Sequence, residues 1–444
     1  MSQRYSALLS VPILAVFLFA TSILAAQADS MSEKSKDLAK QAVSENSVES
    51  TNAINELRMM GSKGLDTLFE VYAADIKRQL TTGDVDAAKW AKIAAALDGV
   101  AKQRNSYAAQ IYWYTDLEKA KAVAQKENKP ILSLRLLGNL NEELSCANSR
   151  FFRTVLYPNA EISRLLRERY VLHWQSVRPV PKVTIDFGDG RKMETTLTGN
   201  SIHYVLDKEG KPLDALPGLY SPTAFLAWLK ESERVFQENE KLQGLAGNSF
   251  LLSYHQLSRE KIERQWRQDL AKVDEKTAKT LANSKVEDPK NEDIVAASAI
   301  SAGRIALTKS VIEIRSVGEI TLPSTEKVLS LEEETDIAEW QKIAAFYAAQ
   351  SHLDANSLAL MRRQTKADAA KLKTLVANFE NYLALDTVRN EYLYHAKIHE
   401  WLSTPVAEDL DKFNDKVYAE LFLTPKSDPW LGLYSPTIYA ALEN

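Results

Sequence analysis

A single cysteine is the most reactive side chain that the sequence offers. Cys146 is the one cysteine among 444 residues, and the run Cys146-Ala147-Asn148-Ser149 opens a predicted helix. A thiolate at a helix N-terminus is stabilised by the helix dipole and by free backbone N–H groups. Ser149 could donate a hydrogen bond to this thiolate, and Arg150 adds positive charge nearby. The pattern indicates either a reactive thiol or a cysteine buried for packing, as free cysteines commonly are.

Histidines are the next candidates for chemistry. His203, on a predicted strand, is the histidine best placed to contact Cys146; the alternative is an ordinary strand residue. His395 and His399 stand four positions apart on one face of a predicted helix, a spacing that can hold a metal ion. The zinc-protease pattern needs Glu directly after the first histidine, whereas Ala396 follows here. The sequence therefore favours a packed or hydrogen-bonded helix face over a metal site, and we expect no cofactor.

Alternating strands and helices must position these residues. Asp116 is placed as a helix N-cap, Gly188-Asp189-Gly190 is typical of a hairpin turn, and Pro222 suits a first helical position. The predicted order is a helix over 116–126, a strand over 131–137, a helix from Cys146 that breaks at Pro158 and resumes over 161–169, a strand over 170–176, a hairpin over 183–197, an antiparallel pair over 202–206 and 212–216, and a helix from Pro222.

This order resembles that of the thioredoxin-like families of exported bacterial proteins, over roughly residues 113–229. The motifs that carry the resemblance are Trp113 with the helix after it, Lys129-Pro130-Ile131-Leu132, Cys146-Ala147-Asn148-Ser149, the strand over 202–207 with Gly210, and Leu216-Pro217-Gly218. The resemblance implies an α/β thioredoxin-like domain over 110–231, with a central mixed sheet flanked by helices. In that family a first cysteine attacks a substrate disulfide and a second resolves the mixed disulfide. Here Cys146 matches the first, and Ser149 replaces the second.

Other positions also depart from the family pattern. The family places a cis-proline beside its active cysteine; that place falls near Ser201, and no proline occurs between Gly199 and Asp207. The first strand carries Ser133 and Arg135, where the family buries an acid beneath its cysteines. A predicted hairpin replaces a helix that the family usually has between its second and third strands. These departures argue against dithiol oxidoreductase activity.

The first residues have the layout of a secretory signal peptide, over 1–28. Arg4 precedes an uncharged stretch over 7–26, and Ala26-Gln27-Ala28 supplies a small-x-small cleavage pattern. An uncleaved membrane anchor is the alternative, although a proline inside the stretch favours cleavage. We therefore expect an exported protein, periplasmic or extracellular, with no membrane contact beyond the signal segment. A lone cysteine forms no internal disulfide there.

The remaining sequence predicts helices and few partners. A helical N-terminal region over 29–109 precedes the thioredoxin-like domain, and a mainly helical C-terminal domain over 232–444 follows it. Within the latter, a charged segment over 276–293 is predicted to be a linker or an exposed hairpin, and Ser330 to Glu333 form a capping box. The formal net charge of -4, without a basic stripe, argues against a nucleic acid partner.

Three functional hypotheses follow. The first is a binding or scaffold module that lacks a dithiol site, with Cys146 as a monothiol contact point for a protein partner or a small thiol. The second is a monothiol thiol–disulfide exchange enzyme, with Cys146 as nucleophile and Ser149 and the helix start as thiolate stabilisers. The third is a metal- or cofactor-binding helical protein that uses His395 and His399. A reactive thiol requires Cys146 to be exposed at its helix start; a complete redox cycle within one chain is excluded because it needs a second thiol.

Overall fold

The computed structural model divides the chain into two compact units, Met1–Ala101 and Lys102–Asn444. The structure describes residues 32–196, 199–242, 244–283, 336–365, 368–404 and 409–428. The predicted signal peptide, the capping box over 330–333 and the last residue of the predicted hairpin lie outside the described residues.

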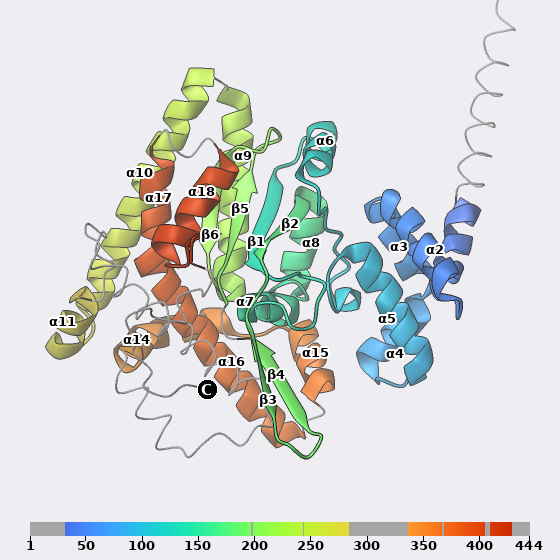
Figure 1. The fold of residues 1–444 in the computed structure, drawn as a ribbon. Helices are drawn as coiled ribbons and strands as arrows, with labels where there is room; N and C mark the ends of the chain where they lie inside the picture. The colour runs from blue at the N-terminus through green and yellow to red at the C-terminus, as the bar shows by residue number, and fades with distance from the viewer. Residues whose placement is uncertain are drawn as a thin grey trace, which may run out of the picture. The chain divides into compact units, whose positions relative to one another are not determined.

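Helices make up the described part of the first unit (Figure 1). Besides a helix over 32–41, these are α2 (Ser47–Met59), α3 (Ser62–Val71), α4 (Ala73–Thr81) and α5 (Ala87–Ala101). The side chain of Asn46 begins α2 by accepting backbone N–H groups of the first turn. Gly64 lets α3 approach α2, because a Cβ at this position would clash with the backbone of Leu57. Leucines of these helices, including Leu57 and Leu65, are buried.

A mixed sheet of four strands forms the centre of the second unit. Its strands are β1 (Ile131–Leu137), β2 (Val171–Arg178), β5 (Ser201–Leu206) and β6 (Pro212–Pro217), in the order β2-β1-β5-β6. β1 pairs with β2 in parallel, β5 pairs with β1 antiparallel, and β6 pairs with β5 antiparallel. Every residue of β1, β5 and β6 is buried, including the polar side chains that these strands carry among their apolar ones.

The elements around this sheet confirm the predicted order of strands and helices. They are α6 (Leu117–Glu127), α7 (Ala147–Phe151), the π-helical turn η2 (Phe152–Leu156), α8 (Ala160–Arg169), the separate hairpin of β3 (Lys182–Asp186) and β4 (Lys192–Thr196), and α9 (Pro222–Leu242). Asp116 caps α6 by accepting the N–H groups of Glu118 and Lys119. α6 and α8 both pack against β2 (Figure 1).

Helices follow through the described remainder of the chain. They are α10 (Gly244–Leu270), α11 (Glu275–Asn283), α14 (Ile337–Ala344), the 3-10 helix η3 (Ala345–Ser351), α15 (Ala355–Thr365), α16 (Ala369–Arg389), the π-helical turn η4 (Asn390–His395), α17 (Ala396–Leu402), α18 (Leu410–Lys416) and the π-helical turn η6 (Val417–Leu421). The prediction of a linker or an exposed hairpin over 276–293 is wrong for its described residues, 276–283, which belong to the helix α11. α11 is stable here because Thr277 and Leu281 are buried and the helix packs against α14.

The later helices share one hydrophobic core with the sheet. The ring of Phe379 on α16 lies 5.0 Å from that of Phe151 on α7, and Phe413 on α18 lies 6.1 Å from Tyr204 on β5. α10 and α17 lie against each other, and α17 also contacts β6 (Figure 1). The sheet thus presents β6 to helices that come from much later in the chain. Among the described helices, none is both long and apolar enough to cross a membrane.

Candidate functional site

Cys146 directly precedes α7, at the helix start where the sequence places it, but its side chain is buried. It occupies the N-cap position of α7, and its relative exposure is 0%. Its backbone N–H donates to the carbonyl oxygen of Leu137 at the end of β1, at 3.2 Å. Of the two alternatives that the sequence left open, the structure thus has the buried cysteine, because the loop after β1 turns Cys146 into the hydrophobic core rather than toward solvent.

Ser149 serves the backbone of this turn rather than the thiol. Its hydroxyl donates to the carbonyl oxygen of Cys146 at 2.7 Å and lies 2.6 Å from the hydroxyl oxygen of Ser145. Both serines are fully buried, so these hydrogen bonds satisfy groups that would otherwise be costly to bury. These hydrogen bonds fix the start of α7. Ser149, which the sequence suggested as a donor to the thiolate, donates instead to a backbone carbonyl oxygen.

Two arginines of this region hold neighbouring loops. Arg150 donates from its Nη2 to the hydroxyl of Thr196 on β4 at 2.6 Å. Burial lowers the pKa of Arg150, and the nearby Cys146 opposes that shift. Arg153 donates to the carbonyl oxygens of Glu142 and Glu143 at 2.9 and 3.2 Å, and so ties down the loop before Cys146. Arg150 therefore lies within electrostatic reach of the sulfur while its guanidinium bonds to the hairpin.

Ser201 hydrogen-bonds to a residue at the start of α7, whereas His203 hydrogen-bonds to Tyr157. Asn148 donates from its side chain to the hydroxyl of Ser201 at 3.0 Å. The Nε2 atom of His203 lies 2.8 Å from the hydroxyl of Tyr157, and the imidazole lies 4.6 Å from the ring of Phe152. Burial lowers the pKa of His203 to about 3, so the ring is neutral. We refer to residues 145–149 as the cysteine turn. The structure thus brings Ser201, but not His203, to the cysteine turn as a hydrogen-bonding neighbour.

The first strand carries polar residues that pair across elements. Ser133 on β1 lies 2.8 Å from Nδ1 of His173 on β2. Arg135, buried on the same strand, pairs with Asp411 of α18 at 3.2 Å. Burial lowers the pKa of Arg135 while Asp411 opposes that shift. The position at which the resembled family has a buried acid thus anchors a C-terminal helix.

The C-terminal segment covers the region beside Cys146. Tyr418 on η6 is buried and donates its hydroxyl to the carbonyl oxygen of Asn200, directly before Ser201, at 3.2 Å. Arg178 at the end of β2 donates to the carbonyl oxygens of Thr424 and Asp428 at 3.0 and 2.9 Å. Burial, and after it the nearby Cys146, raises the pKa of Tyr418 well above its ordinary value. Residues 417–428 therefore occupy the surroundings of the cysteine turn.

A second polar cluster surrounds Asp214 on β6. Asp214 is fully buried, and its Oδ2 accepts hydrogen bonds from the Tyr254 hydroxyl at 2.6 Å and the Trp228 indole at 3.1 Å. Its Oδ1 accepts the backbone N–H of Ala215 at 2.8 Å. Burial would raise the pKa of this carboxyl, but surrounding imidazoles outweigh burial and hold the pKa below its ordinary range.

Three buried histidines stand around this carboxylate. The Nε2 atom of His395 lies 4.0 Å from Oδ1 of Asp214, and Nδ1 of His399 lies 3.9 Å from the same oxygen. His255 on α10 joins them, with its Nδ1 3.0 Å from Nδ1 of His399. Glu391 accepts from Nδ1 of His395 at 2.9 Å. The sequence pair His395 and His399 is thus part of a larger cluster, drawn from β6, α10, η4 and α17.

The charges of these imidazoles differ sharply. Burial lowers the pKa of His255 to about 4 and, with His395 adding to it, the pKa of His399 well below its ordinary value. Burial would also lower the pKa of His395, but the carboxylates of Glu391 and Asp214 raise it to about 10. Without another cation, His395 is therefore the positively charged member beside Asp214.

A close contact between η4 and the turn after β6 positions the cluster. Asn390, the first residue of η4, donates from its side chain to the carbonyl oxygen of Leu219 at 2.8 Å. Gly218, at φ 82°, leaves the space that Asn390 fills, since a Cβ there would clash with the amide. Sequence reasoning missed Asp214 and His255. The acid was detectable as one charged residue within an otherwise apolar strand.

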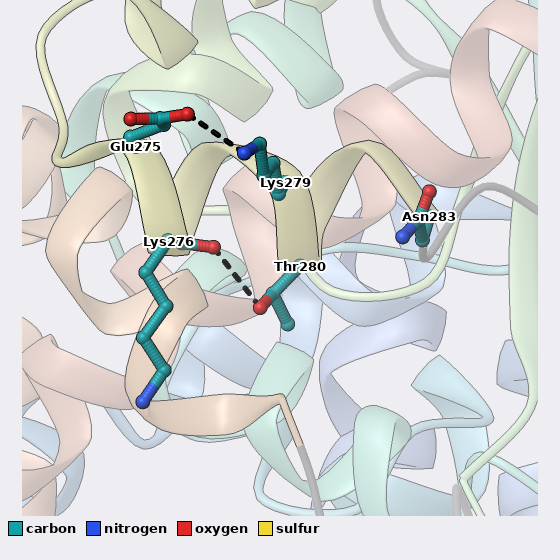
Figure 2. Close-up of a pocket in the computed structure, with 5 residues that line it drawn as sticks. All are labelled: Glu275, Lys276, Lys279, Thr280 and Asn283. Carbon is teal, nitrogen blue, oxygen red and sulfur yellow. Dashed lines mark hydrogen bonds and ion pairs between the residues drawn. The ribbon is translucent and has the colours of Figure 1, made fainter.

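A surface hollow on α11 does not add to either cluster. Figure 2 shows that its lining residues all come from this one helix, namely Glu275, Lys276, Lys279, Thr280 and Asn283. Glu275 pairs with Lys279 at 2.7 Å, and the Thr280 hydroxyl donates to the carbonyl oxygen of Lys276 at 3.1 Å. These are neighbour contacts along a helix, so the hollow brings together no converging chemical groups.

No protein-family model matches this chain, and a search among curated proteins finds no relative. The functional argument therefore depends on the arrangement of the cysteine turn and of the cluster around Asp214.

Proposed function

We propose that this chain is an exported thioredoxin-like protein whose sheet acts as a binding or scaffold module, not as a thiol–disulfide exchanger. The order of elements supports the fold assignment: a parallel pair, β1 and β2, is joined through α7 and α8, and an antiparallel pair, β5 and β6, leads into a final helix, α9. This is the order that the resemblance to thioredoxin-like families predicts.

The burial of Cys146 is the observation that carries the proposal. Exchange requires a thiolate that reaches a substrate sulfur through a mixed disulfide. A thiol with 0% exposure offers no such approach. Ser149, the candidate thiolate stabiliser, already donates to a backbone carbonyl. Packing explains the cysteine without any exchange chemistry.

The scaffold role rests on what the sheet holds in place. Arg135 on β1 pairs with α18, and Asn200 before β5 accepts from Tyr418 on η6. On the edge strand β6, Asp214 joins side chains from α10 and η4. The same sheet thus fixes the C-terminal helices at both regions, and their buried groups need its strands as partners.

Alkylation of Cys146 tests the proposal. We expect iodoacetamide to modify native protein at least ~1,000-fold more slowly than protein unfolded in urea, because modification of a buried thiol requires an opening of the structure. The positive control is a chain with Cys146→Ser and Lys126→Cys, since Lys126 is exposed on α6. This variant should react equally fast in both states. Rapid alkylation of native wild-type protein, with formation of a mixed disulfide with glutathione, would instead support the exchange enzyme.

A further inference from the structure

We propose that Asp214, His395 and His399 bind one divalent transition-metal ion of the Zn²⁺ type, with His255 as a fourth donor. This site goes beyond the scaffold function and does not depend on Cys146. Each of the first three residues offers one ligand atom, and these atoms lie within 4.8 Å of one another, all in buried side chains.

The donor set selects the class of ion. Imidazole nitrogens with one carboxylate oxygen, and no thiolate, suit Zn²⁺ and its neighbours Co²⁺, Ni²⁺ and Fe²⁺ better than Ca²⁺ or Mg²⁺, which prefer oxygen ligands. Three imidazoles and one carboxylate would complete a four-coordinate shell around Zn²⁺. Such a closed shell, formed wholly by buried side chains, is typical of a structural ion rather than a catalytic one.

The distances are compatible with a site that contracts around an ion. Ligand atoms about 2.0–2.1 Å from one zinc ion lie roughly 3.4 Å apart in a tetrahedral shell. The oxygen Oδ1 of Asp214 now lies 4.0 Å from Nε2 of His395 and 3.9 Å from Nδ1 of His399. Side-chain movements of less than about 1 Å would close these distances.

One nitrogen of the cluster has no hydrogen-bond partner. The residue His395 is 6% exposed, and its Nε2 atom is buried without a hydrogen bond. Buried polar atoms are usually hydrogen-bonded, so an orphaned one needs an explanation. This nitrogen faces the carboxylate of Asp214, and a metal ion between them would supply its missing interaction.

The surrounding hydrogen bonds orient the donors as they do around bound metals. A ligating histidine commonly gives its other ring nitrogen to a carboxylate. His395 does so through Nδ1 to Glu391, which itself accepts from the Tyr220 hydroxyl at 3.3 Å. Tyr254 and Trp228 both donate to Oδ2 of Asp214. Oδ1, which also accepts the backbone N–H of Ala215, is the oxygen nearest the imidazoles of His395 and His399.

The charge of the cluster fits a dication. The cluster contains the buried carboxylate of Asp214 and the partly buried carboxylate of Glu391. Among the described residues, their ion-pair partners are histidines, not Lys or Arg. Burying a carboxylate without a counter-charge is costly. Without an ion, the imidazolium of His395 is the one counter-charge among these imidazoles. A divalent ion that binds the neutral imidazole would release this proton and balance both carboxylates at once.

Metal titration of the full chain tests the proposal. Protein treated with EDTA should bind about one Zn²⁺ or Co²⁺ per chain, with a rise in Tm on Zn²⁺ addition and visible Co²⁺ absorption characteristic of a four-coordinate nitrogen and oxygen shell. His395→Gln and His399→Gln should each weaken the affinity at least ~10-fold. His352→Gln is the matched control, because His352 pairs with Glu380 at 3.1 Å outside the cluster and is exposed. This variant should bind as wild type does.

Two results would overturn the metal site. One is folded wild-type protein whose Tm does not change and which binds neither ion at submillimolar concentrations. The other is unchanged affinity in the His395→Gln, His399→Gln double variant. Should the variants not fold, X-ray absorption of the Zn²⁺-loaded wild type decides. Scattering from imidazole and oxygen supports the site, and a sulfur scatterer contradicts it, since sulfur would implicate Cys146. The Tm, stoichiometry and affinity measurements do not depend on the accessibility of Cys146, so the metal proposal and the thiol proposal fail separately.

Discussion

The cysteine turn and the Asp214 cluster are both buried against the same sheet, yet burial has opposite consequences in the two regions. Around Cys146 the neighbouring hydroxyl and amide groups are hydrogen-bonded: Ser149 donates to a carbonyl oxygen and Asn148 donates to Ser201. Around Asp214, burial gathers a carboxylate and imidazoles whose ligand atoms converge, and Nε2 of His395 makes no hydrogen bond. Burial prevents a reagent from reaching the thiol, whereas it places the donor atoms of Asp214, His395 and His399 close to one another.

The largest expected effect is the loss of Asp214. Asp214→Ala should lower the free energy of unfolding by about 3–5 kcal/mol, measured by urea denaturation in EDTA. Tyr254 and Trp228 would lose their acceptor, and His395 would lose a counter-charge. The matched control is Asp207→Ala, a carboxylate of low exposure that accepts only turn N–H groups and should cost about 1 kcal/mol. Equal losses in both variants would contradict a special role for Asp214.

Truncation of Tyr418 should open the cysteine turn. Tyr418→Ala removes a fully buried ring and should destabilise the protein by about 3–5 kcal/mol. It should also speed alkylation of Cys146 by at least ~10-fold under native conditions, because local opening becomes easier. Tyr418→Phe keeps the ring and loses only the hydrogen bond to Asn200, so its alkylation rate should stay near that of wild type. Unchanged alkylation in Tyr418→Ala would mean that residues 417–428 do not protect the thiol.

A moderate pH effect should arise from His203. Its pKa is about 3 in the folded protein against an ordinary value of 6.5, so the unfolded chain binds more protons between these values. Stability from this group is therefore complete above about pH 6.5 and falls as the pH falls toward 3. Between pH 7 and pH 5, the part of the free energy of unfolding that His203 contributes should fall by about 2 kcal/mol.

Urea denaturation at both pH values checks this prediction. His203→Phe should shrink the loss between pH 7 and pH 5 by about 2 kcal/mol, whatever its effect on stability at pH 7. His352→Gln, in which an exposed histidine is replaced, should leave the loss unchanged. The same loss in His203→Phe as in wild type would contradict a neutral, buried imidazole at this position.

The smallest expected effect is on redox activity. Ser149→Cys restores two cysteines separated by two residues, as in dithiol members of the resembled family. Reduction of insulin disulfides should nevertheless stay at the background rate, because positions 146 and 149 are both fully buried. Turnover by this variant would show that the missing second thiol, and not burial, prevents exchange in the natural chain.

Many strands and helices of the second unit could be predicted because their sequence signals are local. The apolar run of β1, the glycines of the β3–β4 turn and Asp116 as the cap of α6 each act within a few residues. The helix α11 was misread because its composition is polar, and only packing against α14 explains why it forms. The burial of Cys146 could not be predicted either, since residues about 270 positions later lie near it.

The sequence by itself determined which side chains exist to do chemistry: one thiol, and a histidine pair at helical spacing. Short-range periodicity and capping also determined most strands and helices of the second unit. Only the tertiary structure decided what these groups meet. It placed Asp214 and His255 beside His395 and His399, and it closed the cysteine turn with Tyr418. Contacts between residues so distant along the chain depend on how whole elements pack, and no local pattern records that packing.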